Sequence, residues 1–176
     1  MVRDLICTYR ASSIYSLKPS LFSKLGFKYL FIDLDNTLVQ YDVMIPPKKV
    51  FLYLEELRKE GIEVIIVSNN VYKRVSAFCS RLDVNYIYRT NKPSPKKVIR
   101  YLKSHSIDVN KCLYIGDQVI NDMILARKAK MRSLLTEPIS KKDHISTRFI
   151  RMIDYRLRSY YLKKGRLGIS LEEQED

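Results

Sequence analysis

The chain has few of the residues that build zinc sites or disulfide frameworks. It contains three cysteines, Cys7, Cys79 and Cys112, and only two histidines. The cysteines lie far apart and form no C-x-x-C pair, so the sequence offers no credible zinc-binding set. We expect all three thiols to be reduced and to lie in or near the core.

Glycine and long hydrophobic runs are also scarce. The five glycines form neither a P-loop nor a dinucleotide-binding fingerprint. The longest aliphatic runs, such as residues 64–67, fall far short of the roughly 18 apolar residues that a membrane span needs. The first ten residues lack the apolar core of a signal peptide. We therefore expect a cytoplasmic protein, with peripheral contact at the inner face of a membrane as a further expectation.

Positive charge, by contrast, is abundant. Thirty-two lysines and arginines stand against 19 acidic residues, and the formal net charge is +13. Such a charge attracts an anionic partner, which is a phosphorylated substrate, an acidic membrane surface or nucleic acid. The charge alone does not choose among these three, and a lysine-rich base composition would produce the same excess.

From residue 29 onward the chain alternates short apolar runs with amphipathic helical patterns. Strands are expected at about 29–33, 62–67, 84–88, 112–115 and 131–135, and helices at about 46–60, 71–82, 94–102 and 119–130. Alternation of this kind is typical of a parallel sheet covered on both faces. The sequence therefore predicts a single α/β domain, a three-layer Rossmann-like fold with a five-stranded parallel core sheet.

The flanks of this core carry most of the remaining charge. We divide the chain into a basic N-terminal flank packed on the core (1–28), the core (29–136), a basic C-terminal helix (137–168) and an acidic tail without fixed structure (169–176). The helix itself is expected over 145–163. Its apolar face is predicted to carry Phe149, Ile153, Leu157 and Tyr160.

Polar side chains follow four of the predicted strands at the point where each strand ends. They are Asp33, Asp35 and Thr37, then Ser68, Asn69 and Asn70, then Asn91 and Lys92, and finally Asp117, Gln118 and Asp122. In open parallel sheets, ligands bind beyond the carboxyl ends of the strands. Carboxylates, a hydroxyl and an ammonium group at one edge suit a divalent cation together with a phosphate.

Each of these groups has a role in phosphoryl transfer. A carboxylate can attack phosphorus and form an aspartyl phosphate. Because phosphate and carboxylate repel each other, a cation must lie between them, and Asp33 with Asp117 can supply the oxygen ligands that Mg²⁺ prefers. A lysine and a hydroxyl can hold the other phosphoryl oxygens. A second carboxylate can protonate the leaving group and then activate water.

Taken singly, these residues have simpler explanations. Ser68 alone is more often a helix cap, and Lys92 alone is usually a surface lysine. An EF-hand calcium loop starting at Asp33 is a poor match, because Leu38 replaces its glycine and Met44 replaces its glutamate. Four such groups at one sheet edge are much harder to explain as coincidence.

The segment Asp33-Leu-Asp35-Asn-Thr37-Leu38 resembles the D-x-D-x-T motif of the haloacid-dehalogenase-like phosphatases. Ser68, Lys92 and the Gly116–Asp122 segment resemble the second, third and fourth motifs of that family, in the right order. The Ser-Asn-Asn, Lys-Pro and Gly-Asp-Gln details are similar to its YqeG-type, subfamily IIIA branch, which is related to the mitochondrial phosphatidylglycerophosphate phosphatases. The resemblance runs from about residue 12 to 168.

This resemblance implies a role for each matched residue. Asp33 is implied to be the nucleophile, and Asp35 the acid/base that also offers its backbone carbonyl to the metal. The implied phosphate-binding residues are Thr37, which also orders the first loop, Ser68, Asn69 and Lys92. The implied ligands of Mg²⁺ or of its water shell are Asp33, Asp35, Asp117 and Asp122. Asn121 stands where relatives often have threonine. This difference leaves the acidic residues intact and affects only the surroundings of the metal.

The presence of Asp35 favours rapid hydrolysis over phosphotransfer, since the phosphorylated pumps of the wider superfamily lack that second acid. The first alternative is a phosphatase for a nucleotide, a sugar phosphate or a nucleic-acid end. The second is an RNA- or ribosome-associated binding protein of the same fold with little turnover. The intact acidic set and the lack of a visible RNA motif argue against the second alternative.

Neither inter-motif segment leaves room for a cap domain, and an open site suits a large substrate that covers it. Residues 141–166 hold nine basic and two acidic side chains, an excess of +7. A solvated helix face would explain this excess, and so would contact with an anionic membrane. The favoured substrate is phosphatidylglycerophosphate, a lipid headgroup. We expect the membrane contact to involve Arg151, Arg156, Arg158 and Lys163.

Overall fold

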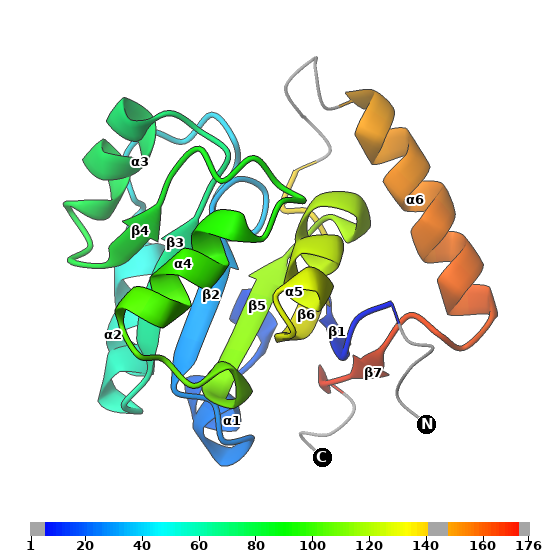
Figure 1. Cartoon of the computed structure of the whole chain (residues 1–176), viewed down its shortest axis with the longest axis horizontal. Coiled ribbons are helices and arrows are strands. Elements are labelled where there is room, and N and C mark those ends of the chain that lie inside the picture. The colour runs from blue at the N-terminus through cyan, green and yellow to red at the C-terminus, as the bar shows by residue number, and fades with distance from the viewer. Residues whose placement is uncertain (1–5, 141–147, 173–176) are drawn as a thin grey trace.

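The computed structural model describes residues 6–140 and 148–172, in which seven strands form one parallel sheet. Figure 1 shows this sheet at the centre of the molecule. The strand order is β4-β3-β2-β5-β6-β1-β7. The strands are β1 (Tyr9–Ala11), β2 (Tyr29–Asp33), β3 (Glu63–Val67), β4 (Asn85–Ile87), β5 (Cys112–Gly116), β6 (Arg132–Thr136) and β7 (Ile169–Ser170).

Helices cover both faces of the sheet, as the three-layer prediction requires. They are α1 (Pro19–Lys24), α2 (Lys48–Lys59), α3 (Tyr72–Cys79), α4 (Lys96–Ser104), α5 (Ile124–Lys128) and α6 (Arg148–Lys163), with short 3₁₀ turns η1 (Ile14–Ser16) and η2 (Val109–Lys111). Successive strand residues point to opposite faces. Leu30 and Ile32 therefore pack with α1, α2 and α3, whereas Phe31 packs with α4 and α5, which lie in front of the sheet in Figure 1.

The sheet has two strands more than the five that the sequence predicts, because each flank of the core adds one strand. Tyr9 of β1 pairs with Leu134 of β6 on one side and with Ile169 of β7 on the other. These strands are only three and two residues long, so they carry too little periodicity to be read from the sequence. The sequence-based division at residue 28 therefore cuts across the sheet.

The tail was expected to lack fixed structure from residue 169, and this is wrong for residues 169–172. Leu171 is fully buried, and Glu172 accepts hydrogen bonds from the side chains of Ser12 and Ser16. These contacts tie the residues that follow β7 to the N-terminal segment. Residues 173–176 lie outside the described part of the chain.

The helix predicted over 119–130 is two elements in the structure. A π-helical turn, η3 (Val119–Met123), precedes α5. Within it the backbone N–H groups of Asp122 and Met123 both donate to the carbonyl of Gln118, and the Asp122 carboxylate accepts from the Gln118 N–H at 3.0 Å. The wider turn points the Asp122 side chain back toward the end of β5, a use typical of π-helical turns at functional sites.

Strand register brings the predicted motifs to one level. Asp33 pairs with Val67, so Ser68 follows directly beside it, and Ile32 pairs with Ile115, which puts Gly116 and Asp117 at the same edge. Only a loop separates Thr37 from α2, and only α3 and β4 lie between Ser68 and Lys92. The expected absence of a cap domain therefore holds for these two described segments.

The C-terminal helix α6 packs in part through its predicted apolar face. Ile153 and Leu157 are half-buried, and Leu157 packs against a hydrophobic cluster that includes Val119, whereas Tyr160 is exposed. The buried residues of the helix are charged, namely Arg151, Asp154 and Arg158. Figure 1 shows α6 along the side of the sheet, and it contacts η3. The side chain of Phe149 lies outside the described residues. No helix in the described ranges combines the length and apolarity needed to cross a bilayer.

Candidate active site

Asp33, the last residue of β2, lies buried beside a lysine. Lys92 Nζ is 2.5 Å from Asp33 Oδ1 and 2.7 Å from Asp122 Oδ1, and the Lys92 side chain is 5% exposed. Tyr114 on β5 also donates its hydroxyl to Asp122 Oδ1, at 3.3 Å. A single ammonium group therefore bridges the ends of β2 and η3.

Asp117 lies directly after β5 and is fully buried. Its Oδ1 accepts a hydrogen bond from the Thr37 hydroxyl at 3.2 Å, and its Oδ2 lies 2.6 Å from Arg151 Nη1. Thr37 therefore joins the first loop to the fourth motif. Burial raises the pKa of Asp117 to about 6, although Arg151 opposes the shift.

Three carboxylates here form a set that suits a divalent cation. One oxygen from each of Asp33, Asp117 and Asp122 lies within 4.8 Å of the others. Burial raises the pKa of Asp33 well above its usual range. Lys92 opposes that shift, and the neighbouring carboxylates add to it. An added cation would act in the same direction as Lys92, so an all-oxygen, strongly acidic pocket of this kind fits Mg²⁺.

The close packing of this pocket depends on Gly116. A Cβ atom at Gly116 would lie 2.3 Å from Asp122 Cγ, a separation that side chains do not tolerate. The backbone of β5 therefore approaches the Asp122 carboxylate as closely as only glycine permits.

Asp35 lies apart from the three clustered carboxylates. Arg74 Nη2 on α3 is 3.1 Å from Asp35 Oδ1 and 3.2 Å from the carbonyl of Tyr41, and Asn70 Nδ2 donates to Asp35 Oδ2. Burial raises the pKa of Asp35, while Arg74 and Asn70 oppose the shift. Its side chain is 24% exposed, compared with 8% for Asp33. A raised pKa and partial exposure suit a group that exchanges protons.

Ser68 and Asn69 connect the second motif to the lysine loop. Ser68 is buried, and its Oγ accepts from the Asn70 N–H at 3.1 Å. The side-chain oxygen of Asn69 accepts from the Thr90 hydroxyl at 2.9 Å and from the Lys92 N–H at 2.8 Å. That oxygen therefore holds the loop of Lys92 and leaves the implied phosphate contact to other atoms of Asn69.

Sequence reasoning gave no role to Arg74 and placed Arg151 on an outer surface. Arg74 and Phe78 are four residues apart on α3, and the Arg74 guanidinium lies over the Phe78 ring at 5.8 Å. In α6, Arg151, Asp154 and Arg158 follow one another at spacings of three and four, which places them on one helical face. Assigning each charged residue to a face of its helix would have drawn attention to both arginines, whereas the total charge of a segment does not.

The structure thus brings together Asp33, Lys92, Asp117 and Asp122 and keeps Asp35 beside them with its own partners. Such a pocket can hold a cation, present a buried carboxylate to an electrophile and move a proton at a neighbouring carboxyl group.

Comparisons with known proteins agree with this geometry. The family model of the haloacid dehalogenase-like hydrolases matches residues 12–136. The Bacillus subtilis (strain 168) protein named "Probable phosphatase YqeG" is 31% identical over 155 residues, which cover 88% of this chain and 90% of that protein. The crystal structure of an uncharacterized protein from Listeria monocytogenes serotype 4b is similar in fold, with a TM-score of 0.52, 15% identity, and coverage of 68% of this chain and 87% of that one. The matched motifs and the matched length show that this chain belongs to the haloacid dehalogenase-like hydrolases.

Proposed function

We propose that the protein is a magnesium-dependent phosphatase that hydrolyses phosphomonoesters through an aspartyl phosphate on Asp33. The observation that carries this proposal is the buried Asp33, paired with Lys92 and clustered with Asp117 and Asp122, with Asp35 held two residues away. The similarity to the protein named "Probable phosphatase YqeG" supports the same reaction class.

In the first step a carboxylate oxygen of Asp33 attacks phosphorus, and the bond from phosphorus to the leaving oxygen breaks. The Asp35 carboxyl group gives its proton to that oxygen, so an alcohol departs. In the second step Asp35 takes a proton from water, the water oxygen attacks phosphorus, and the bond to Asp33 breaks. Inorganic phosphate leaves and both aspartates return to their starting state.

The other residues hold the phosphoryl group during both steps. In the proposed reaction Lys92 offsets its negative charge, the Ser68 hydroxyl donates a hydrogen bond to it, and Thr37 keeps Asp117 in place. Asp33, Asp117 and Asp122, with the backbone carbonyl of Asp35, would hold Mg²⁺, which supplies positive charge to the phosphoryl oxygens.

The experiment that tests this function is a screen of the purified protein against lipid, nucleotide and sugar phosphates. We expect phosphate release with Mg²⁺, none in excess chelator, and recovery when Mg²⁺ is restored. Calcium should bind but support little turnover, because its looser coordination disturbs in-line geometry. Full activity in excess chelator would contradict the proposed metal dependence, and release from no substrate at all would favour a binding protein of the same fold.

We further propose phosphatidylglycerophosphate as the substrate. Three observations support this choice, namely the YqeG-type motifs, the site without a cap domain and the outer face of α6. The headgroup of this lipid ends in a phosphomonoester, and its acyl chains remain in the bilayer. The enzyme must therefore meet a surface, and a lid over the site would obstruct that approach.

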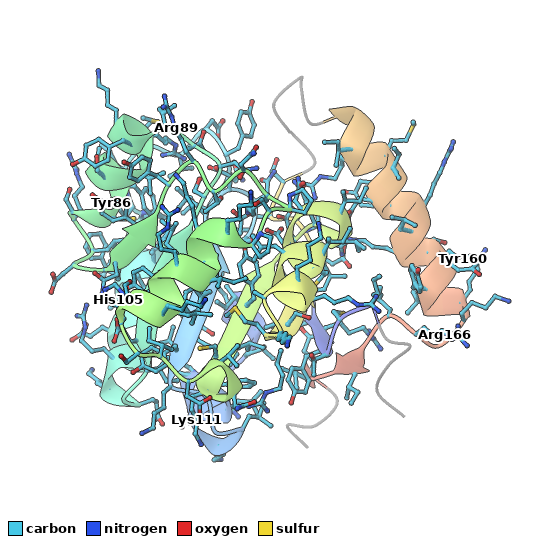
Figure 2. All side chains as sticks on the ribbon, in the orientation of Figure 1. Tyr86, Arg89, His105, Lys111, Tyr160 and Arg166 are labelled. Atoms are coloured by element: carbon cyan, nitrogen blue, oxygen red, sulfur yellow. The ribbon has the colours of Figure 1, made fainter. Side chains whose placement is uncertain are left out.

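The outer face of α6 is the surface that suits such contact. Together with Lys164, which follows the helix, it exposes apolar and basic side chains, namely Met152, Tyr155, Arg156, Tyr160, Leu162 and Lys163. Figure 2 labels Tyr160 on this side of the helix. A lysine or arginine near an anionic bilayer contributes about 1 kcal/mol, so three of them favour reversible, salt-sensitive binding without permanent anchoring.

Two of the four basic residues expected at the membrane have other roles in the structure. Arg151 and Arg158 are each 6% exposed and contact acidic partners inside the protein. Arg156 and Lys163 remain exposed. A test of membrane contact must therefore leave the first pair intact.

We expect the protein to cosediment with anionic vesicles at low salt and to be released at high salt. Changing Arg156, Lys163 and Lys164 together to glutamine should weaken vesicle binding and spare turnover of a small soluble phosphate. The matched control changes Arg127, Lys128 and Lys130, which are exposed on or next to α5. A protein that ignored anionic vesicles and preferred a nucleotide or a sugar phosphate would overturn the lipid substrate and leave the phosphatase mechanism standing.

A further inference from the structure

The inner face of α6 reaches the proposed metal pocket through a row of buried charges. Asp154 is fully buried and accepts the backbone N–H of Ile120 in η3 at 3.1 Å. Arg158 donates to Asp154 Oδ2 at 3.1 Å and to the carbonyls of Asp117 and Thr136. These contacts fix α6 against the segment that follows β5.

Arg151 occupies a special place in this row, because it contacts a side chain of the pocket itself. Its Nη1 lies 2.6 Å from Asp117 Oδ2, and both side chains are nearly or fully buried, at 8% and 0% exposed. The other oxygen of Asp117, Oδ1, accepts the Thr37 hydroxyl. The two oxygens of one carboxylate thus have different partners from opposite ends of the chain.

This division limits how Asp117 can hold a cation. A carboxylate binds a cation through both oxygens only when both are available. The neutral Thr37 hydroxyl uses one lone pair of Oδ1 and leaves the other for a cation, whereas the positive guanidinium group holds Oδ2. Calcium accepts two-oxygen carboxylate binding and six to eight ligands, whereas Mg²⁺ demands near-ideal octahedral geometry with one oxygen from each carboxylate.

We propose that Arg151 is a positioning residue that holds Asp117 as a one-oxygen ligand and thereby makes the site select Mg²⁺ over Ca²⁺. The proposal rests on the metal pocket of the proposed function, but not on the substrate or the chemical steps. The positive charge of Arg151 also repels a divalent cation from Asp117 Oδ2. Residues behind metal ligands commonly tune metal affinity by about 10- to 100-fold.

Arg158 provides a matched comparison on the same helical face. It is as buried as Arg151, at 6% for each residue. It donates to the Asp154 and Glu137 carboxylates and to the backbone carbonyls of Asp117 and Thr136, and its contact with Asp117 is to the backbone and not to the carboxylate. Arg158 therefore anchors α6, whereas Arg151 acts on the ligand.

The test measures metal binding without substrate, as the shift of the thermal midpoint of the full chain during titration with MgCl₂ or CaCl₂. In the wild type we expect tighter binding of Mg²⁺ than of Ca²⁺. In Arg151→Gln the ratio of the two apparent affinities should fall about tenfold, and Arg151→Lys should recover part of it. Arg158→Lys should lower the midpoint without changing the ratio, and Arg127→Gln should change neither.

An unchanged ratio in a folded Arg151→Gln protein would overturn the proposal. If that variant fails to fold, Arg151→Lys provides the test, because it keeps the charge but loses the planar fork. Its Mg²⁺/Ca²⁺ affinity ratio should lie below that of the wild type, and an unchanged ratio would overturn the proposal. A wild type without preference for Mg²⁺ would overturn the proposal whatever the variants do. A protein that shows the expected ratios but hydrolyses no phosphomonoester would overturn the proposed function alone.

Discussion

The two halves of the site place the same chemical pair in different surroundings. Asp33 and Lys92 form a carboxylate–cation pair at 8% and 5% exposure, next to two further buried carboxylates. Asp35 and Arg74 form a second pair at 24% and 10% exposure, with an amide and a loop carbonyl as further partners. One pair is closed off among acids, and the other lies at the rim.

This difference is what the proposed mechanism requires of two aspartates two residues apart. In that mechanism the inner carboxylate attacks phosphorus, and it lies beside the Lys92 cation. The outer carboxylate is partly exposed, which suits the proton transfer proposed for it. Changing a residue of either pair and measuring turnover and metal binding tests whether the two pairs differ in function.

The largest effect is expected from Asp33→Asn, because an amide does not attack phosphorus. Turnover of every substrate should fall by about 10⁴-fold or more, while the thermal midpoint stays near that of the wild type. Asp42→Asn, in an exposed position of the following loop, is the control and should keep full activity. Wild-type rates in Asp33→Asn would show that the inner carboxylate is not the nucleophile.

Asp35→Asn should reduce turnover by about 10²- to 10⁴-fold, the usual contribution of a general acid/base. The loss should be larger for an alkyl phosphate than for an aryl phosphate, since an aryl oxygen leaves without a proton. Phosphorylated protein should accumulate during turnover and be visible by intact-protein mass spectrometry. Equal losses for both substrate types would contradict the assignment of Asp35 to the leaving group.

Arg74→Gln should have a smaller effect, about 10- to 100-fold on turnover, because a displaced catalytic group costs that much. Arg74 holds both Asp35 and the loop carbonyl of Tyr41, so its loss releases the outer half of the site. Lys73→Gln on the exposed side of α3 is the matched control. Metal binding, followed by thermal shift, should remain unchanged, which would separate the rim pair from the inner one.

The smallest expected effect is the pH dependence of Mg²⁺ binding and of stability at Asp117, in the buried half of the site. Burial raises the pKa of Asp117 from 3.8 to about 6, so below that pH a metal must displace a proton. Apparent Mg²⁺ affinity should fall about tenfold for each pH unit below it. Without metal, raising the pH has the opposite effect, because it lowers the stability of the fold. The folded state then holds a proton that the unfolded chain has lost, so this group reduces stability as pH rises from 3.8 to about 6. Thermal midpoints measured with and without MgCl₂ test both directions.

The central sheet and its acidic edge could be predicted because their signals are strong and local. Buried strands carry continuous apolar runs, such as residues 64–67 in β3, and Asp33 and Asp117 stand directly at strand ends. What the sequence did not predict depends on distant partners. β1 pairs with residues more than 120 positions away, and Arg151 meets Asp117 across 34 positions. A total charge cannot separate Arg151 from the exposed Arg156, because only the packing of α6 distinguishes them.

The sheet joins segments that are far apart in the sequence, and this affects the order in which its parts are synthesised. β1 leaves the ribosome before its neighbours β6 and β7, which are made more than 120 residues later. Asp33 and Lys92 are likewise made long before Arg151. During synthesis, domains fold as units once their parts have emerged. A nascent chain therefore carries every matched motif before it has the helix that holds Asp117, so the proposed metal pocket is completed only after α6 has emerged.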